Sequence, residues 1–385
     1  MPDRVTQFFF NRFKKNEAKL HDLRYLFWEC TARCNLSCLH CGSDCSAGAA
    51  QPDMPFADFL AAIRPLQAAY PRNSITVAVT GGEPLLRPDL AACGRALREA
   101  GFLWGLVSNG CAYDEACHER LRAAGLGALT ISLDGLEESH NWLRNTPRGF
   151  ARAVRAISLA ARERALAFDV VTCVNKRNLP ELPALKALLE GLGVRAWRLF
   201  TIAPIGRAAE REDLLLDGPQ LRALFDFIAR ERAGAGRGGM AVTFSCEGYT
   251  GPYERRVRDN YFFCRAGIHI ASILLDGSIS ACPNIDRGFS EGNIYQDDFL
   301  TVWNTRFARM RSRAWMRDGP CADCAAFRDC RGGALHLRKP GVRGPLVCHY
   351  QMLGLTRPLR GPSARAYAPA PCAQGCRTAP AGTRR

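Results

Sequence analysis

The chain has 385 residues, of which 47% are hydrophobic and 23% charged, and its formal net charge is +15. This composition predicts a folded protein long enough for two domains, and the absence of an apolar run of about 18 residues argues against a membrane span. No secretory leader accompanies the eighteen cysteines, so we expect reduced thiols in a cytoplasmic protein. The sequence has no basic run with interleaved aromatic residues, so we expect no nucleic-acid partner.

Residues 1–22 form an N-terminal extension that is interrupted by charged residues. Across residues 23–205, short β-rich runs then alternate with longer segments of helical period. The six expected strands are 23–29, 74–80, 103–108, 128–134, 168–174 and 194–202. Because crossovers between parallel strands are right-handed, this alternation predicts an α/β fold, a partial (β/α)6 barrel of the TIM type.

The loops after the first four expected strands carry the unusual sequences of the chain. A cysteine cluster follows the first strand, "GGEP" the second, "NG" the third and "DG" the fourth. The carboxyl ends of barrel strands gather the functional loops at one face. We therefore expect the functional site at that face.

Within the cluster, Cys34, Cys38 and Cys41 have the spacing C-x3-C-x2-C. Three thiolates on one short loop could bind three irons of a four-iron cubane and leave the fourth iron open. A closed zinc site or an electron-transfer cluster uses four protein ligands, and Cys30 or Cys45 could supply the fourth. The spacing alone leaves these alternatives open.

The cysteine triplet, His40 in the usually aromatic place before the last cysteine, and the GGEP turn together resemble the radical S-adenosylmethionine (SAM) enzymes over residues 23–202. The resemblance implies a [4Fe–4S] cluster on Cys34, Cys38 and Cys41 whose open iron binds SAM. It further implies cleavage of SAM to a 5′-deoxyadenosyl radical, which abstracts a substrate hydrogen. An external electron donor of the flavodoxin or ferredoxin type would supply the electron.

The resemblance also implies a set of SAM contacts at the strand ends. Gly81, Gly82 and Glu83 would receive the methionine amino group, because glycine permits close approach of the backbone. The ribose and methionine parts would contact Ser108, Asn109, Ser132 and Asp134. Arg144 would face the SAM carboxylate.

Residues 206–259 are expected to form a helical connection with a Gly-rich hinge, and residues 260–352 contain a second set of cysteines. Their order is Cys264, Cys282, Cys321-x2-Cys324-x5-Cys330 and Cys348. This pattern resembles the SPASM extension of radical SAM enzymes, a small cysteine-rich iron–sulfur domain. A zinc ribbon is the alternative for the C-x2-C pair alone.

The resemblance implies one complete auxiliary [4Fe–4S] cluster and one incomplete site. Cys321, Cys324, Cys330 and Cys348 would hold the complete cluster. Ala334 stands where the SPASM pattern has a further cysteine, so the second site keeps Cys264 and Cys282. His336 or His349 could replace a missing ligand. The basic tail, residues 353–385, is expected to be disordered. Its Cys372 and Cys376 could bind metal, but two ligands on such a segment are weak evidence for a site.

Because SPASM extensions occur in peptide- and protein-modifying enzymes, we expect an oxidoreductase that acts as a maturase of a ribosomally made peptide or protein. Sulfatase-maturing members carry an aspartate after the second cysteine of the extension. Here Pro283 follows Cys282, which argues against formylglycine formation. The alternatives are oxidative modification of a small cofactor precursor, such as a tetrapyrrole, and a non-catalytic iron–sulfur or zinc scaffold.

Overall fold

The computed structural model describes residues 4–236, 238–245 and 247–356. The expected disorder of the tail falls on residues 357–385, and these residues, with Cys372 and Cys376, lie outside the described part. Residues 353–356 follow the last helix directly, and Leu353 is buried.

The described part of the chain contains a sheet of ten strands in the order β10-β9-β8-β1-β2-β3-β4-β5-β6-β7. The strands are β1 (Tyr25–Glu29), β2 (Thr76–Thr80), β3 (Leu103–Ser108), β4 (Ala128–Ser132), β5 (Ala167–Val174), β6 (Ala196–Thr201), β7 (Ala241–Phe244), β8 (Ile270–Ile273), β9 (Ser278–Ser280) and β10 (Gly292–Asn293). Strands β1 to β7 are parallel to their neighbours and follow chain order, so the partial barrel predicted from the sequence is confirmed.

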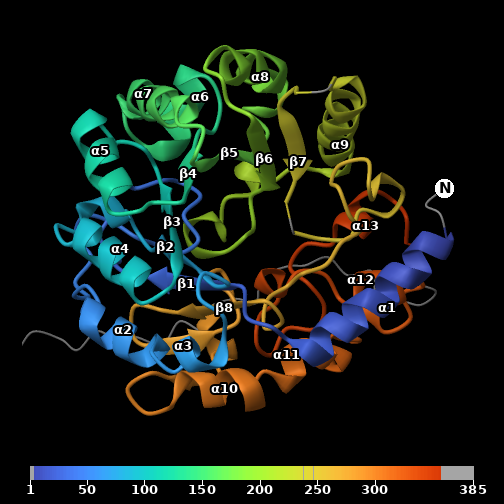
Figure 1. Cartoon of the computed structure of the whole chain (residues 1–385). Helices are drawn as coiled ribbons and strands as arrows, with labels where there is room; N and C mark the ends of the chain where they lie inside the picture. Colours follow the sequence, from blue (N-terminus) through green and yellow to red (C-terminus); the bar gives the residue numbers. More distant parts are fainter. Residues whose placement is uncertain (1–3, 237, 246, 357–385) are drawn as a thin grey trace, which may run out of the picture. The chain divides into compact units, whose positions relative to one another are not determined.

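The helices lie mostly on the outer side of the curved sheet (Figure 1). They are α1 (Arg4–Leu20), α2 (Phe56–Ile63), α3 (Leu66–Ala69), α4 (Leu90–Glu99), α5 (Glu115–Ala123), α6 (Glu137–Arg144), α7 (Gly149–Arg162), α8 (Leu182–Gly191), α9 (Gly218–Gly234), α10 (Phe299–Thr305), α11 (Ala308–Ser312), α12 (Phe327–Cys330) and α13 (His349–Met352). Of these, α1 packs instead against α11 and α12 (Figure 1). Strand tryptophans Trp28, Trp104 and Trp197 are fully buried, and Trp28 stacks on Phe59 of α2 with ring centroids 4.6 Å apart. These aromatic contacts fix the helical layer against the strands.

Two strands extend the barrel beyond the six expected ones. The segment 206–259, expected to be a helical connection, contains α9 but also β7, which pairs in parallel with β6. β7 is only four residues long, and alternation over so few residues is a weak signal in a sequence. At the other edge, β8 pairs in parallel with β1, so the cysteine-rich region continues the barrel sheet.

Candidate active site

The cysteine loop folds back on itself at the carboxyl end of β1. Cys34, Cys38 and Cys45 are buried in one cluster, and Cys41 packs against them. The amide of Cys34 donates to the Ser46 carbonyl at 3.1 Å, which closes the loop. Arg207 fastens it from outside, because its guanidinium donates to the carbonyls of Cys38 at 2.8 Å and Cys45 at 3.0 Å. The structure thus brings the predicted triplet together.

The two extra cysteines considered as ligands lie in different places. Cys30 is fully buried in the core of the barrel, and burial raises the pKa of its thiol. Cys45 lies beside Cys41, and its hydrogen bond lowers the pKa of Cys41 to about 5, although burial opposes this shift. Burial raises the pKa of Cys34 to about 11. Thiolates are the metal-binding form, and Cys45 favours that form at Cys41.

The GGEP turn supports the cysteine loop directly. A Cβ on Gly81 would lie 2.3 Å from the Thr31 carbonyl oxygen, and one on Gly82 would lie 2.2 Å from that of Arg33. The amide of Gly82 also donates to the Thr31 carbonyl at 2.7 Å. Glycine is therefore required here for packing against the chain just before Cys34, in addition to any contact with SAM.

Glu83 is completely buried at the end of β2, and the next strand end supplies its partners. Its carboxylate accepts hydrogen bonds from the Ser108 hydroxyl at 2.9 Å and from the Asn109 amide at 2.8 Å. The Asn109 side chain donates to Asn35 in the cysteine loop at 2.8 Å. Ser108 and Asn109, expected to touch SAM, thus hold Glu83 and the loop.

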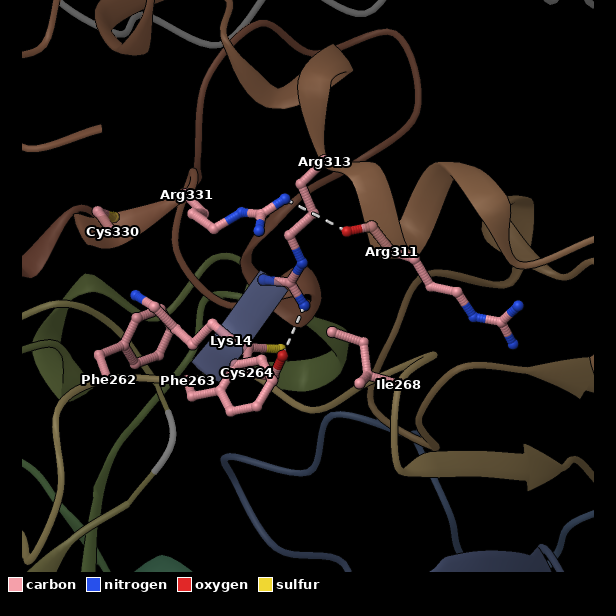
Figure 2. Close-up of a pocket in the computed structure, with 9 residues that line it drawn as sticks. All are labelled: Lys14, Phe262, Phe263, Cys264, Ile268, Arg311, Arg313, Cys330 and Arg331. Atoms are coloured by element: carbon pink, nitrogen blue, oxygen red, sulfur yellow. Dashed lines mark hydrogen bonds between the residues drawn. The ribbon is translucent and has the colours of Figure 1, made fainter. Parts of the chain in front are cut away.

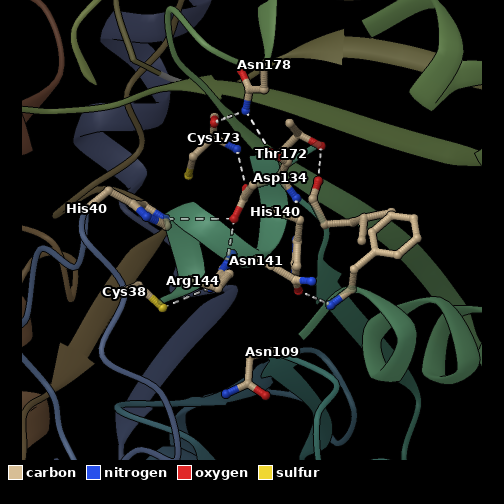
Figure 3. A network of polar contacts seen from close by, with 12 residues as sticks. Cys38, His40, Asn109, Asp134, His140, Asn141, Arg144, Thr172, Cys173 and Asn178 are labelled. Atoms are coloured by element: carbon tan, nitrogen blue, oxygen red, sulfur yellow. Dashed lines mark hydrogen bonds and ion pairs between the residues drawn. The ribbon is translucent and has the colours of Figure 1, made fainter. Parts of the chain in front are cut away.

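A buried ion pair lies beside Cys38 (Figure 3). The Arg144 guanidinium of α6 donates to Asp134 at 2.6 Å and lies 3.7 Å from the Cys38 sulfur. The amide of Cys173 on β5 donates to the same carboxylate at 2.8 Å. Although burial alone would raise the pKa of Asp134, Arg144 holds it below its usual range. Asp134 therefore fixes Arg144 beside the cluster loop.

His40 completes this part of the pocket. Its Nε2 lies 4.0 Å from Asp134, and its buried Nδ1 has no hydrogen-bond partner among the described residues. Burial lowers the pKa of His40 to about 4, so the imidazole is neutral. A buried polar atom without a partner fits a bound molecule with a complementary polar group. Ser132 is buried at the end of β4.

The four cysteines of the expected complete auxiliary site interact with one another. Burial raises the pKa of Cys330 to about 12, and the nearby Cys348, Cys321 and Cys324 add to this rise. Arg338, almost fully buried, donates to the Cys321 sulfur at 3.2 Å. Four adjacent thiols with a cation beside them fit the four-thiolate set of a [4Fe–4S] cluster.

The incomplete auxiliary site contains an arginine (Figure 2). Arg313 donates to the carbonyls of Cys264 at 2.9 Å and Gly333 at 3.1 Å. Ala334 is fully buried, and the cavity beside Cys264 measures about 10 Å³, about the space of one water molecule. These residues do not fit a second auxiliary cluster.

A polar cavity of about 300 Å³ lies between the cysteine loop and the auxiliary region. The loop contributes Gly42, Ser43 and Asp44, and β1 contributes Glu29. The auxiliary region contributes charged residues of both signs together with uncharged ones, and the full set is Pro283, Asn284, Ile285, Asp286, Arg287, His336, Arg338 and Lys339. His336 is thus placed in this cavity. His349 instead lies 3.2 Å from the Thr201 hydroxyl at the end of β6.

Comparisons with known proteins agree with this geometry. The radical SAM superfamily model matches residues 28–188, and the model of the SPASM iron–sulfur cluster-binding domain matches residues 264–325. The chain therefore belongs to the radical SAM superfamily. It is a radical SAM enzyme with a C-terminal SPASM domain, and these domains imply a [4Fe–4S] cluster with SAM and auxiliary iron–sulfur binding.

Two curated relatives differ in what they make. The AdoMet-dependent heme synthase of Methanosarcina barkeri (strain Fusaro / DSM 804) is 28% identical over 80% of this chain and 90% of that protein. The mycofactocin maturase MftC of Mycobacterium ulcerans (strain Agy99) is 28% identical over 80% of this chain and 82% of that protein. The solved structure of Streptococcus suis SuiB bound to S-adenosylmethionine has a TM-score of 0.64 at 17% identity, covering 84% of this chain and 77% of that chain.

Several supporting residues were not predicted from the sequence. Arg207 and Arg313 are distant in sequence from the loops that they fasten, and arginine is common throughout this chain, so no local signal marks them. The sequence indicated Cys45 only as a possible ligand of the cluster.

None of the described helices is long and apolar enough to cross a membrane.

Proposed function

We propose that this radical SAM enzyme modifies a peptide or protein, and that the segment to be modified enters the polar cavity between the cysteine loop and the auxiliary region. The supporting observation is the mixed lining of that cavity. Asp286 offers a carboxylate, Lys339 a cation, and Ser43 and Asn284 neutral polar groups. Asp44 and Arg287 also line the cavity, as members of ion pairs with Arg207 and with Glu29. Such a lining suits a peptide, whose backbone and ends present donors, acceptors and both charges.

The cysteines of the barrel loop and of the four-cysteine auxiliary set are the residues that fit the implied cofactors. Cys34, Cys38 and Cys41 would bind the cluster, with SAM toward His40 and Arg144, and the four-cysteine set would bind the auxiliary cluster. When bound, the cluster and SAM supply abstraction of a hydrogen atom from a C–H bond. The chain itself fixes Arg144 through Asp134, keeps His40 neutral, and orients the substrate through the cavity lining.

Isotope transfer tests the peptide substrate. Reconstituted enzyme is incubated with SAM, dithionite and a short peptide encoded beside its gene, deuterated at its C–H positions. One deuterium in 5′-deoxyadenosine, together with a mass change of the peptide, is the expected result. A Lys339→Glu/Arg287→Glu variant should reduce peptide turnover about tenfold while still cleaving SAM without substrate. Absence of deuterium transfer from every such peptide contradicts the proposal.

A second candidate function is oxidation of a tetrapyrrole, and the observation that favours it is the similarity to a heme synthase over 90% of that protein's length. The same reaction with an iron porphyrin that carries carboxylate side chains separates the two candidates. A shift of the porphyrin absorption bands and a change of porphyrin mass would support this candidate over the peptide.

A further inference from the structure

Helix α1 places polar residues against the protein, and two of its phenylalanines, Phe10 and Phe13, contact Phe263, whereas Phe8 and Phe9 face outward. Gln7, Lys14 and Glu17 are its buried residues. Phe8, Phe9 and Phe13 are 59%, 62% and 44% exposed. The large hydrophobic residues exposed in the described part of the chain are concentrated here: Val5, Phe8, Phe9, Phe13 and Leu20 lie on α1, and Tyr25, Tyr295 and Val342 lie elsewhere. A gathered apolar patch of this kind indicates an interaction site.

The polar face of α1 accounts for how the helix is held. The Lys14 ammonium donates to the Asp329 carbonyl at 2.7 Å, and the Asn11 amide donates to the Asp329 carboxylate at 2.6 Å. Glu17 lies 2.7 Å from the His269 ring and 3.3 Å from Arg24. Because these contacts hold the helix through its polar face, Phe8 and Phe9 remain available to a partner.

The helix lies over the auxiliary cysteines. It contacts α11 and α12, and α12 ends at Cys330, one residue after Asp329 (Figure 1). Lys14 lines the same small cavity as Cys264 and Cys330 (Figure 2). A protein bound to the outer face of α1 would therefore lie close to the four-cysteine auxiliary set.

Charge on the outer face of α1 has one sign. Arg4, Arg12, Lys15 and Lys19 are exposed, whereas Glu17, the helix's acidic residue, is buried and paired. Arg328, with its side chain 81% exposed, adds a cation next to Asp329. An apolar patch with a cationic rim is complementary to a partner with an acidic surface around an apolar contact.

We propose that the outer face of α1 is the docking surface for a small acidic electron-transfer protein, which exchanges electrons with the auxiliary cluster of this radical SAM enzyme. One electron leaves the reduced carrier, enters through the auxiliary region and would pass from there to the barrel site, where SAM cleavage consumes it; the transfer itself makes and breaks no bond. The area of a single helix of 17 residues suits the small, transient interfaces of electron-transfer proteins. The inference rests on the family chemistry and is independent of the peptide substrate.

The test compares α1 variants with matched controls, using a purified acidic ferredoxin as the probe. Phe8→Ser/Phe9→Ser/Phe13→Ser removes the patch, and Val342→Ser is its apolar control. Arg12→Glu/Lys15→Glu reverses the rim, and Arg64→Glu/Arg95→Glu is its charge control. Biolayer interferometry at low and high salt should give Kd values raised at least tenfold in both α1 variants, with the control values unchanged.

A kinetic readout separates docking from folding. The ferredoxin concentration that half-saturates 5′-deoxyadenosine formation should rise in the α1 variants, while the dithionite-driven rate stays at the wild-type value. This rate and the iron content also show that the variants have folded. Unchanged ferredoxin Kd values overturn the proposal. Two other outcomes also overturn it, provided that the α1 variants still bind ferredoxin. In one, the variants no longer sediment with anionic phosphatidylglycerol vesicles; in the other, light scattering shows that they have changed from a dimer to a monomer. Failure of the peptide assay alone leaves these measurements unaffected.

Discussion

The barrel pocket and the auxiliary region both gather cysteines, but they place positive charge beside them differently. In the barrel, Arg144 is paired with the carboxylate of Asp134 at 2.6 Å. In the auxiliary region, Arg313 donates to the carbonyls of Met310, Gly333 and Cys264, and Arg311 to those of Gly267, Asn304 and Trp303. Carbonyls satisfy the guanidinium donors without cancelling the charge, so Arg311 and Arg313 are buried cations without a carboxylate partner among the described residues. Arg338, beside Cys321 of the four-cysteine set, is instead paired with Asp318 at 2.8 Å, as Arg144 is with Asp134.

This difference indicates two ways to prepare a site for thiolates. A nearby cation favours the thiolate over the thiol, and burial opposes it. The barrel pocket relies on one short loop, with a hydrogen bond from Cys45 to Cys41. The auxiliary region relies on arginines from separate segments, and at its incomplete site Arg313 donates to the Cys264 carbonyl beside a cavity of about 10 Å³.

The largest expected effect comes from removing the barrel triplet. Cys34→Ala/Cys38→Ala/Cys41→Ala should abolish 5′-deoxyadenosine formation, because no ligand set for the cluster remains. Cys30→Ala is the control, since Cys30 lies in the core of the barrel. Chromatography of the reaction products measures the effect. Undiminished 5′-deoxyadenosine from the triple variant would contradict the assignment of this pocket.

The next effect concerns the two auxiliary sites. We expect about eight irons per chain after reconstitution, against about twelve if both auxiliary sites fill. Cys324→Ala should lose about one cluster, or four irons, and destabilise the surrounding region. Cys264→Ala and Cys282→Ala should leave most iron bound.

Iron and sulfide analysis with Mössbauer spectra checks these variants. A third four-iron cluster in the wild-type protein that is lost in Cys282→Ala would show that both auxiliary sites bind a cluster. The assignment of one complete and one incomplete site would then be wrong.

The sequence predicted the parts of this comparison that depend on local spacing. The C-x3-C-x2-C loop and the first six strands follow from short patterns, and the structure contains all of them. The contacts of Glu83 with Ser108 and of Arg313 with Cys264 join residues far apart in the chain. Such pairs depend on tertiary packing, which one sequence does not reveal. For the same reason, the outward-facing phenylalanines of α1 could not be distinguished from core residues by their pattern.

A smaller effect is expected at Gly82. A Cβ at this position would collide with the Arg33 carbonyl, one residue before Cys34, so Gly82→Ala should displace the cysteine loop. We expect partial loss of the roughly four irons of the barrel cluster, about one to two of the eight irons per chain, together with weaker SAM binding. Gly48→Ala is the matched control, because nothing lies within 4 Å of its added Cβ. Iron content and equilibrium dialysis with SAM measure both properties. Full iron content with weaker SAM binding would instead indicate a direct role in binding SAM.

The smallest effect concerns the junction of the two regions, where Glu247 meets the barrel end and the auxiliary helix α13. Its carboxylate accepts hydrogen bonds from the Thr201 amide at 2.8 Å and hydroxyl at 2.6 Å, and it lies 3.7 Å from His349. Burial raises the pKa of Glu247 from 4.5 to about 7. The folded protein therefore holds an extra proton between these two pH values.

Stability from this proton is complete below pH 4.5 and is lost as the pH rises through about 7. Glu247→Gln keeps a neutral side chain at every pH, so the wild-type free energy of unfolding should fall relative to the variant by roughly 3 kcal/mol between pH 4.5 and pH 8. His349, whose pKa burial lowers to about 3, is present in both proteins and cancels in the difference. Thermal unfolding at pH 5 and pH 8 measures the gap in Tm, with Glu119→Gln on the exposed face of α5 as the control. A gap that is the same at both pH values would mean that Glu247 is ionised in the folded protein, and that the junction is held by an ion pair with His349.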